Sequence, residues 1–351
     1  MTLPIPEWQA WFASKISEAA FSERREPYLQ FGTYAKRFDD HLGGVAMVTT
    51  DLPKRLAKAK LGGLWISTQQ RLWSTFDWMS LQYSAGAPVS LLADVWPYAL
   101  EWAEEYGRFH ADYHTSEENK SGDITPHVAL VSEEYWYAAL RLVCFGLLTG
   151  NADKMPRVMA FIDYANADLD IYDGLLERLV APWVPGRPIP DKATRHLPYR
   201  KLFKVFDAEP DKRPALMAKY LDEWYHASRR EPYIDQHGGA AMSFYGYWSW
   251  EAAATTIVLG IDDASYRDMP FYPKDLADFA RQQAGSGAEA DTKPDRVPAG
   301  QPCPRSGWWY TPAQAGSRRH FRQGDVFPKI ERTDYGETFW LWAQDQSAPT
   351  L

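Results

Sequence analysis

The chain has 351 residues, enough for one large or two medium domains with sizeable cores, and its 16 tryptophans are far above ordinary usage. Its net charge of -8 argues against direct nucleic-acid binding, because phosphates require a basic surface, but suits a basic protein partner. No basic segment followed by an apolar run opens the chain, and no apolar run reaches about 18 residues, so we expect neither a secretory signal nor a membrane span. Two cysteines, Cys144 and Cys303, cannot form a zinc site by themselves, so we expect a reduced, cytoplasmic protein without a metal or cofactor.

Apolar residues at helical spacing predict several helices in the first half of the chain. The first covers residues 5–20, and a long helical stretch over residues 52–84 is interrupted at Gly62 and Gly63. A third helix is expected from Val89 to His110. Thr125 as N-cap and Gly150 as C-terminal cap then bracket a helix that is apolar on nearly every face in its second half, which places it at the centre of a core.

The second half begins after a proline-rich connector, residues 182–200. An amphipathic helix around residues 216–225 and a nearly apolar helix over residues 241–259 are expected to form a second core. Residues 285–300 lose all apolar periodicity and predict a flexible linker. Short aromatic runs separated by glycine and proline predict a small β-rich tail over residues 301–351.

Motifs of the first half return in the same order in the second. Residues 24–28, Arg-Arg-Glu-Pro-Tyr, recur as residues 229–233, and a His-Gly-Gly pattern follows each copy, with one inserted residue in the first. Two Tyr-Trp pairs, residues 135–136 and 247–248, each precede an Ala-Ala pair and an apolar run that ends in glycine. We therefore predict a mainly α protein, a helical bundle-like array from a diverged internal duplication with a small C-terminal β-rich appendage. The expected halves are residues 1–181 and 201–284.

Glu251 is a single carboxylate within an otherwise apolar or hydroxyl-bearing segment. A buried carboxylate requires a cationic or hydrogen-bonding partner, or must take up a proton. Arg229 and Arg230 are the expected partners in a buried ion pair that fixes helix register, and a catalytic acid or base is the alternative interpretation. His110 and His114 have the spacing of metal ligands on one helical face, but no third ligand is evident and the helix is expected to end near them, so we predict no metal site.

Acidic residues gather in two segments that we expect to be exposed. The first contains Asp112, Glu117, Glu118 and Asp123, and the second contains Asp163, Asp168, Asp170 and Asp173. Ordinary solvated surface is the simpler interpretation, and a docking surface for a basic protein is the functional one. Because no EF-hand pattern is present, calcium ligation is not expected.

The sequence contains no nucleophile elbow, Walker loop, dinucleotide-binding glycine motif or His-Glu-x-x-His motif. It therefore gives no positive reason to predict an enzyme.

A resemblance to a known family adds to this interpretation. The segment Tyr220–Asp263 resembles the PoNi-like immunity proteins of bacterial polymorphic toxin systems. The motifs that carry this resemblance are Glu223-Trp224-Tyr225, Arg230-Glu231-Pro232, Gly-Tyr-Trp-Ser-Trp-Glu-Ala-Ala at residues 246–253 and Leu-Gly-Ile-Asp-Asp at residues 259–263. The tail is similar to tails of immunity proteins from type VI secretion loci, in Cys-Pro-Arg-Ser-Gly-Trp-Trp (residues 303–309), Gly-Asp-Val-Phe-Pro (324–328) and Tyr335-Gly336 ahead of Trp340. The resemblance implies a cytoplasmic antitoxin that binds one toxin domain and blocks it.

Many toxins paired with this family are DNases, which present a basic groove. We hypothesise that the acidic protein occupies that groove by mimicking phosphate charge, with the two acidic clusters as the docking residues. Two alternatives stay open: a helical enzyme with an aromatic-lined pocket that uses Glu251 and His237, and an adaptor or cargo-binding protein of a secretion system.

Overall fold

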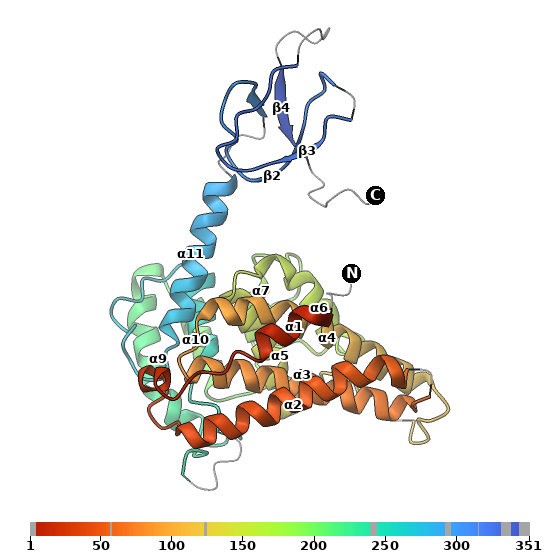
Figure 1. Ribbon diagram of the computed structural model, residues 1–351. Coiled ribbons are helices and arrows are strands. Elements are labelled where there is room, and N and C mark those ends of the chain that lie inside the picture. The colour runs from red at the N-terminus through yellow and green to blue at the C-terminus, as the bar shows by residue number, and fades with distance from the viewer. Residues whose placement is uncertain are drawn as a thin grey trace. The chain divides into compact units, whose positions relative to one another are not determined.

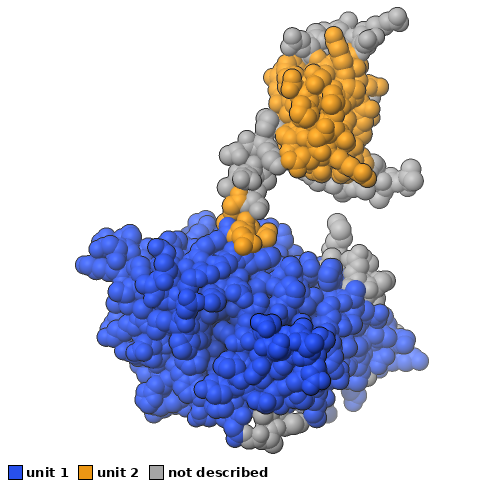
Figure 2. All heavy atoms as spheres, turned by 60° about the vertical axis from the view of Figure 1, so that its left-hand side comes forward, with its two compact units in different colours: residues 1–281 blue, residues 282–351 orange. Residues whose placement is uncertain are grey.

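The computed structural model describes residues 5–56, 58–122, 125–238, 244–291, 296–314, 316–330 and 338–343 (Figure 1). The chain forms two compact units, residues 1–281 and residues 282–351 (Figure 2). The first is helical and the second holds a small antiparallel sheet, so the predicted mainly α fold with a C-terminal β-rich appendage is confirmed.

The α-helices of the described residues are α1 (Ile5–Phe12), α2 (Phe31–Arg55), α3 (Leu61–Ser84), α4 (Val89–Thr115), α5 (Glu133–Leu148), α6 (Met155–Asp163), α7 (Gly174–Val180), α8 (Phe203–Phe206), α9 (Arg213–Ala227), α10 (Trp250–Val258) and α11 (Lys274–Asp291). Short 3-10 turns lie at Ala20–Glu23, Ala152–Lys154, Tyr199–Leu202 and Pro210–Lys212. None of the helices in the part of the chain that the structure describes is both long and apolar enough to cross a bilayer.

Two long helix pairs build one side of the helical unit. Helix α2 packs along α3, and α3 packs along α4 (Figure 1). The sequence analysis predicted no helix before residue 52 in this region and so missed most of α2, which contains Gly43, Gly44 and Pro53. Tertiary contact with α3 overrides these low helix propensities.

Helices α5 and α10 pack together in the core of this unit. They are the apolar runs of the two copies in the predicted duplication, and they end alike. Gly150 (φ +80°) and Gly260 (φ +60°) take the left-handed conformation, and the following residue donates its N–H to a carbonyl five positions back, Asn151 N to Gly146 O and Ile261 N to Thr256 O, both at 2.9 Å. The matching ends support the duplication, which stays a prediction.

The two expected helical halves share one hydrophobic core. A single cluster of buried residues runs from Trp8 to Ala280 and includes both α5 and α10. The expectation of separate first and second cores is therefore wrong, because the paired central helices come one from each half.

Several predicted boundaries shift in the structure. The helix placed over residues 125–150 begins only at Glu133, and the helix placed over residues 241–259 begins at Trp250, after residues 244–249, which have no regular secondary structure. Helix α11 continues to Asp291, so the first residues of the predicted flexible linker are helical, and its last residues belong to a strand.

The second unit has a four-stranded antiparallel sheet in the order β1-β4-β2-β3. Its strands are β1 (Arg296–Pro298), β2 (Gly307–Tyr310), β3 (Arg319–Phe321) and β4 (Phe339–Trp342). A separate buried cluster of Val297, Cys303, Trp309, Phe321, Phe327 and Trp340 packs on one face of this sheet. Three of the strands coincide with the predicted aromatic runs.

Candidate functional site

Asp173 belongs to the predicted exposed cluster but is fully buried, and this is a correction. It is the N-cap of α7 and accepts hydrogen bonds from Leu175 N (2.9 Å) and Leu176 N (3.0 Å). It also accepts from Trp136 Nε1 at 2.9 Å and from both N (2.8 Å) and Oγ1 (2.7 Å) of Thr194. An aspartate satisfies exposed N–H groups at a helix start, so this residue has a structural role and is inaccessible to a partner.

The other members of the second cluster differ in their surroundings. Asp163 forms a bidentate ion pair with Arg187, at 2.6 and 2.7 Å, and is only half-buried. Asp168 and Asp170 are exposed, and their carboxylates form no ion pair within the described residues. These two residues, beside an exposed Leu169, are the free part of the predicted cluster.

The first cluster lies at the end of α4 and in the turn after it. Helix α4 continues through Asp112 to Thr115, so the expected helix end near His110 is wrong. Asp112 and Glu117 are exposed and unpaired among the described residues, whereas Glu118 accepts from Leu61 N (3.2 Å) and Gly62 N (3.1 Å) and so caps α3. Asp123 lies outside the described residues.

The two acidic segments approach each other around Tyr164, which follows α6. Its ring stacks on His127, with centroids 4.7 Å apart, and its edge meets His110 of α4. Partial burial raises the pKa of Tyr164, and the negative charge of Asp112 raises it further. Asp112 on α4 therefore lies near the segment that continues to Asp168 and Asp170, although about 50 residues separate them in sequence.

Glu251 is buried as predicted, but its partners are neutral groups. Its Oε1 accepts hydrogen bonds from Tyr220 Oη, Trp224 Nε1 and Ser249 Oγ, each at 2.7 Å. Arg229 and Arg230 are exposed, so the expected ion pair is a second correction. Burial raises the pKa of Glu251, and its hydrogen bonds oppose that shift. Neutral donors within the core satisfy the carboxylate without the desolvation of a second charge.

His110 and His114 do face each other, with their Nε2 atoms 3.2 Å apart. Among the residues that the structure describes, no group of three or more His, Cys, Asp or Glu side chains is placed to hold a metal ion.

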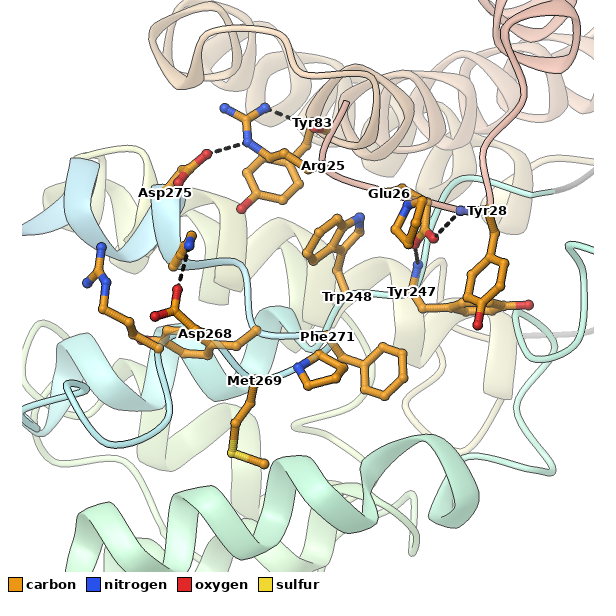
Figure 3. A pocket seen from close by; sticks show the side chains of 15 residues that line it. Arg25, Glu26, Tyr28, Tyr83, Tyr247, Trp248, Asp268, Met269, Phe271 and Asp275 are labelled. Carbon is orange, nitrogen blue, oxygen red and sulfur yellow. Dashed lines mark hydrogen bonds and ion pairs between the residues drawn. The ribbon is translucent and has the colours of Figure 1, made fainter. Parts of the chain in front are cut away.

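A cleft of about 490 Å³ opens where the first motif copy meets the second half of the chain (Figure 3). Arg25 lies at one side of this cleft, where it pairs with Asp275 and donates to Tyr83 O (2.9 Å) and Ala87 O (2.8 Å). Tyr28, Tyr247, Trp248 and Phe271 supply its aromatic walls. Four of its ionic groups are paired within the cleft, Arg25 with Asp275 and Lys274 with Asp268.

Glu26 joins the two motif copies and was not predicted as a key residue. Its carboxylate accepts from Tyr28 N (3.0 Å) and from Tyr247 N (2.8 Å), and its burial raises its pKa (Figure 3). Its counterpart in the second copy, Glu231, is buried as well and accepts from Arg195 (2.7 Å) and Tyr199 Oη (3.2 Å). The repeated pentapeptide could have pointed to these residues, because in each copy its glutamate connects the turn to a distant segment through hydrogen bonds.

The aromatic-lined cleft does not bring together the pair proposed for an enzyme. Neither Glu251 nor His237 lines it. His237 instead places Nδ1 2.6 Å from Tyr247 Oη and packs its ring 4.4 Å from that of Tyr28, measured between centroids. The two residues therefore do not form an acid and base across this cleft.

Comparison with known proteins places part of the chain in a family. Residues 171–276 match the family model of the C-terminal region of PoNe immunity proteins (PoNi), which confirms the resemblance predicted from Tyr220–Asp263. No curated protein matches the chain. The solved structure of protein PA2201 from Pseudomonas aeruginosa is similar, with 18% sequence identity and a TM-score of 0.65 over 81% of this chain and 100% of that one. At that identity the likeness extends to the fold alone.

Proposed function

We propose that this chain, whose residues 171–276 carry the C-terminal region of a PoNi immunity protein, binds a cognate polymorphic toxin and inhibits it by covering its active site. The observation that carries the proposal is the family match, which spans α7 to the first residues of α11 and includes the buried Glu251 network. The family name gives the class of partner, a toxin of the PoNe type.

The proposed docking surface consists of Asp112, Glu117, Asp168 and Asp170, called the acidic surface below. All four are exposed and unpaired within the described part of the chain. Asp112 lies in the last turn of α4, where the helix dipole already adds partial negative charge, and Asp168 and Asp170 lie in the turns that follow α6. The carboxylate of Asp112 therefore opposes the stability of α4, which is understandable if it serves binding.

The surrounding charge supports a basic partner. Residues 1–295 contain 31 Lys and Arg against 41 Asp and Glu, a net charge of -10. Such a surface speeds the encounter with a basic protein. A nuclease toxin must bind phosphates and therefore has a basic groove, so we propose a type VI secretion DNase as the toxin, with the acidic surface standing in for phosphate. The inhibitor would act in the cytoplasm of the cell that makes the toxin.

Co-expression with the toxin candidate encoded beside this chain tests the proposal. We expect protection from toxicity and a stoichiometric complex on copurification. Protection without any complex would contradict inhibition by binding, and a complex without protection would favour the adaptor function.

Charge reversal then tests the docking surface. Asp168→Lys with Asp170→Lys, and Asp112→Lys with Glu117→Lys, should each weaken the complex at least tenfold. The matched control is Asp211→Lys with Asp222→Lys, which makes the same charge change at exposed positions on the second half of the helical unit. If the control weakens binding as much as the two test pairs, net charge and not the acidic surface governs the association.

A further inference from the structure

The overall negative charge conceals a basic segment in the second unit. Residues 296–330 contain five arginines and one lysine but a single acidic residue, Asp325. Residues 331–351 add one arginine and four acidic residues, so residues 296–351 carry a net charge of +2. The whole second unit, residues 282–351, has eight basic and eight acidic residues and no net charge, against -8 for residues 1–281. The argument from net charge against nucleic acid therefore does not extend to the basic residues 296–330.

The sheet of this unit has one buried face and one open face. Residues paired across antiparallel strands share a face, so the pairs Trp308 with His320 and Tyr310 with Leu341 lie on the same side. Phe339, two residues before Leu341, lies on that side as well. None of these side chains belongs to the buried cluster or packs against it, whereas Trp309 and Trp340 on the other side are fully buried.

The open face carries aromatic rings on the two central strands. In the order β1-β4-β2-β3, Trp308 and Tyr310 are on β2 and Phe339 is on β4. Tyr310 is 39% exposed, and Trp308 and Phe339 are half-buried. Aromatic side chains at adjacent positions of an open sheet are a surface on which unpaired bases stack.

Two of these rings each have an arginine over them, one from each side of the sheet. The guanidinium of Arg296, on edge strand β1, is 3.9 Å from the ring centroid of Phe339, and that of Arg318, beside edge strand β3, is 4.9 Å from a ring of Trp308. His320 is exposed on β3 of the same face. Asp325, the single acidic residue of residues 296–330, accepts from Arg322 N at 2.7 Å and so is engaged by the backbone.

We propose that the open face of the β1-β4-β2-β3 sheet binds single-stranded nucleic acid. Bases stack on Trp308, Tyr310 and Phe339, and Arg296 and Arg318 contact the flanking phosphates. Aromatic rings interleaved with arginine fit single-stranded nucleic acid better than an acidic protein. The carboxylates of an acidic protein would pair with the arginines, but they would make no favourable contact with the exposed rings. This function is independent of toxin inhibition and departs from the sequence expectation of no direct nucleic-acid binding.

The test is fluorescence anisotropy of the full chain with a labelled single-stranded DNA. The DNA is longer than the ~4–16 nucleotides that one oligonucleotide-binding fold occupies. We expect saturable binding at low ionic strength that weakens as salt rises. Tyr310→Ala should lower affinity roughly tenfold without unfolding the unit, because this side chain is outside the buried cluster. Arg296→Glu with Arg318→Glu should weaken binding further and flatten its salt dependence.

The matched control is Arg229→Glu with Arg230→Glu, which makes the same charge change at exposed positions of the helical unit. Unchanged affinity in the control is expected. Equal weakening in the control, no binding by the unaltered chain, or displacement of the DNA by an equal charge of polyglutamate would each overturn the proposal. The last result would identify a surface for acidic proteins.

Discussion

Glu251 is a buried carboxylate that accepts hydrogen bonds only from neutral donors. Removing its side chain should therefore lower the free energy of unfolding more than replacing it by a neutral side chain of the same shape. Glu251→Ala leaves the donors of Tyr220, Trp224 and Ser249 without an acceptor, and we expect a loss of about 2–4 kcal/mol in the free energy of unfolding. Glu251→Gln keeps an oxygen acceptor and should cost less. Urea denaturation followed by tryptophan fluorescence measures both.

The raised pKa of Glu251 also fixes the sign of a pH effect. A carboxyl whose pKa is higher in the folded chain than in the unfolded one contributes fully below its unfolded pKa, and that contribution is lost as pH rises through the folded pKa. The unaltered chain should therefore lose stability relative to Glu251→Gln as pH rises from the ordinary carboxyl pKa of 4.5 toward the raised pKa of the folded chain. A difference that stays constant over this range would mean that Glu251 titrates alike in both states.

Asp173 and its neighbours in sequence should respond to substitution in opposite ways. Asp173→Ala removes the acceptor of five hydrogen bonds in the core, so we expect a loss of roughly 3–5 kcal/mol in the free energy of unfolding. Asp168→Ala with Asp170→Ala should change it by less than about 0.5 kcal/mol, because both side chains are exposed and unpaired within the described residues. Equal losses in the two variants would refute the structural assignment of Asp173.

At the scale of the element, the prediction succeeded where the apolar pattern was continuous. The aromatic runs of the tail became β2, β3 and β4, and the apolar run before Gly150 became α5. Helix α2 was missed although its buried residues Tyr34, Phe38, Val45, Val48 and Leu52 are spaced by three, four or seven positions, which places them on one helical face.

The candidate site was harder to predict than the helices, because its residues depend on contacts across the chain. The sequence located Asp168 and Asp173 in one cluster, but only the fold separates an exposed carboxylate from a helix cap that receives the Trp136 indole. It placed Arg229 near Glu251 by proximity in sequence, whereas the structure supplies Tyr220 and Trp224 from the inward face of α9. The local sequence pattern predicts that a polar side chain is buried, but it does not predict which residue forms a hydrogen bond with that side chain.

The position of Asp112 at the end of α4 predicts a conflict between stability and binding. A negative charge in the last turn opposes the helix dipole, so Asp112→Asn should stabilise the fold by about 0.3–1 kcal/mol. The same change removes a carboxylate from the acidic surface and should weaken the toxin complex. Thermal unfolding and isothermal titration calorimetry measure the two effects. A variant that is more stable and binds as tightly would exclude Asp112 from the docking surface.

At the scale of the whole molecule, the two separate hydrophobic clusters predict that the tail can unfold without the helices. Trp309 is fully buried among Phe321, Phe327 and Trp340, and replacing a buried tryptophan by alanine costs about 3–5 kcal/mol. The single hydrophobic core of a unit of this size rarely contributes more than roughly 3–5 kcal/mol to the free energy of unfolding. Trp309→Ala should therefore abolish hydrogen-exchange protection of the amides in residues 296–343, while α3, α5 and α10 keep theirs. Tyr310→Ala, on the open face of the same strand, is the control and should leave protection intact.

Because the acidic surface lies on α4 and after α6, the Trp309→Ala variant should also retain inhibition of the toxin. Loss of inhibition in this variant would show that the tail takes part in docking.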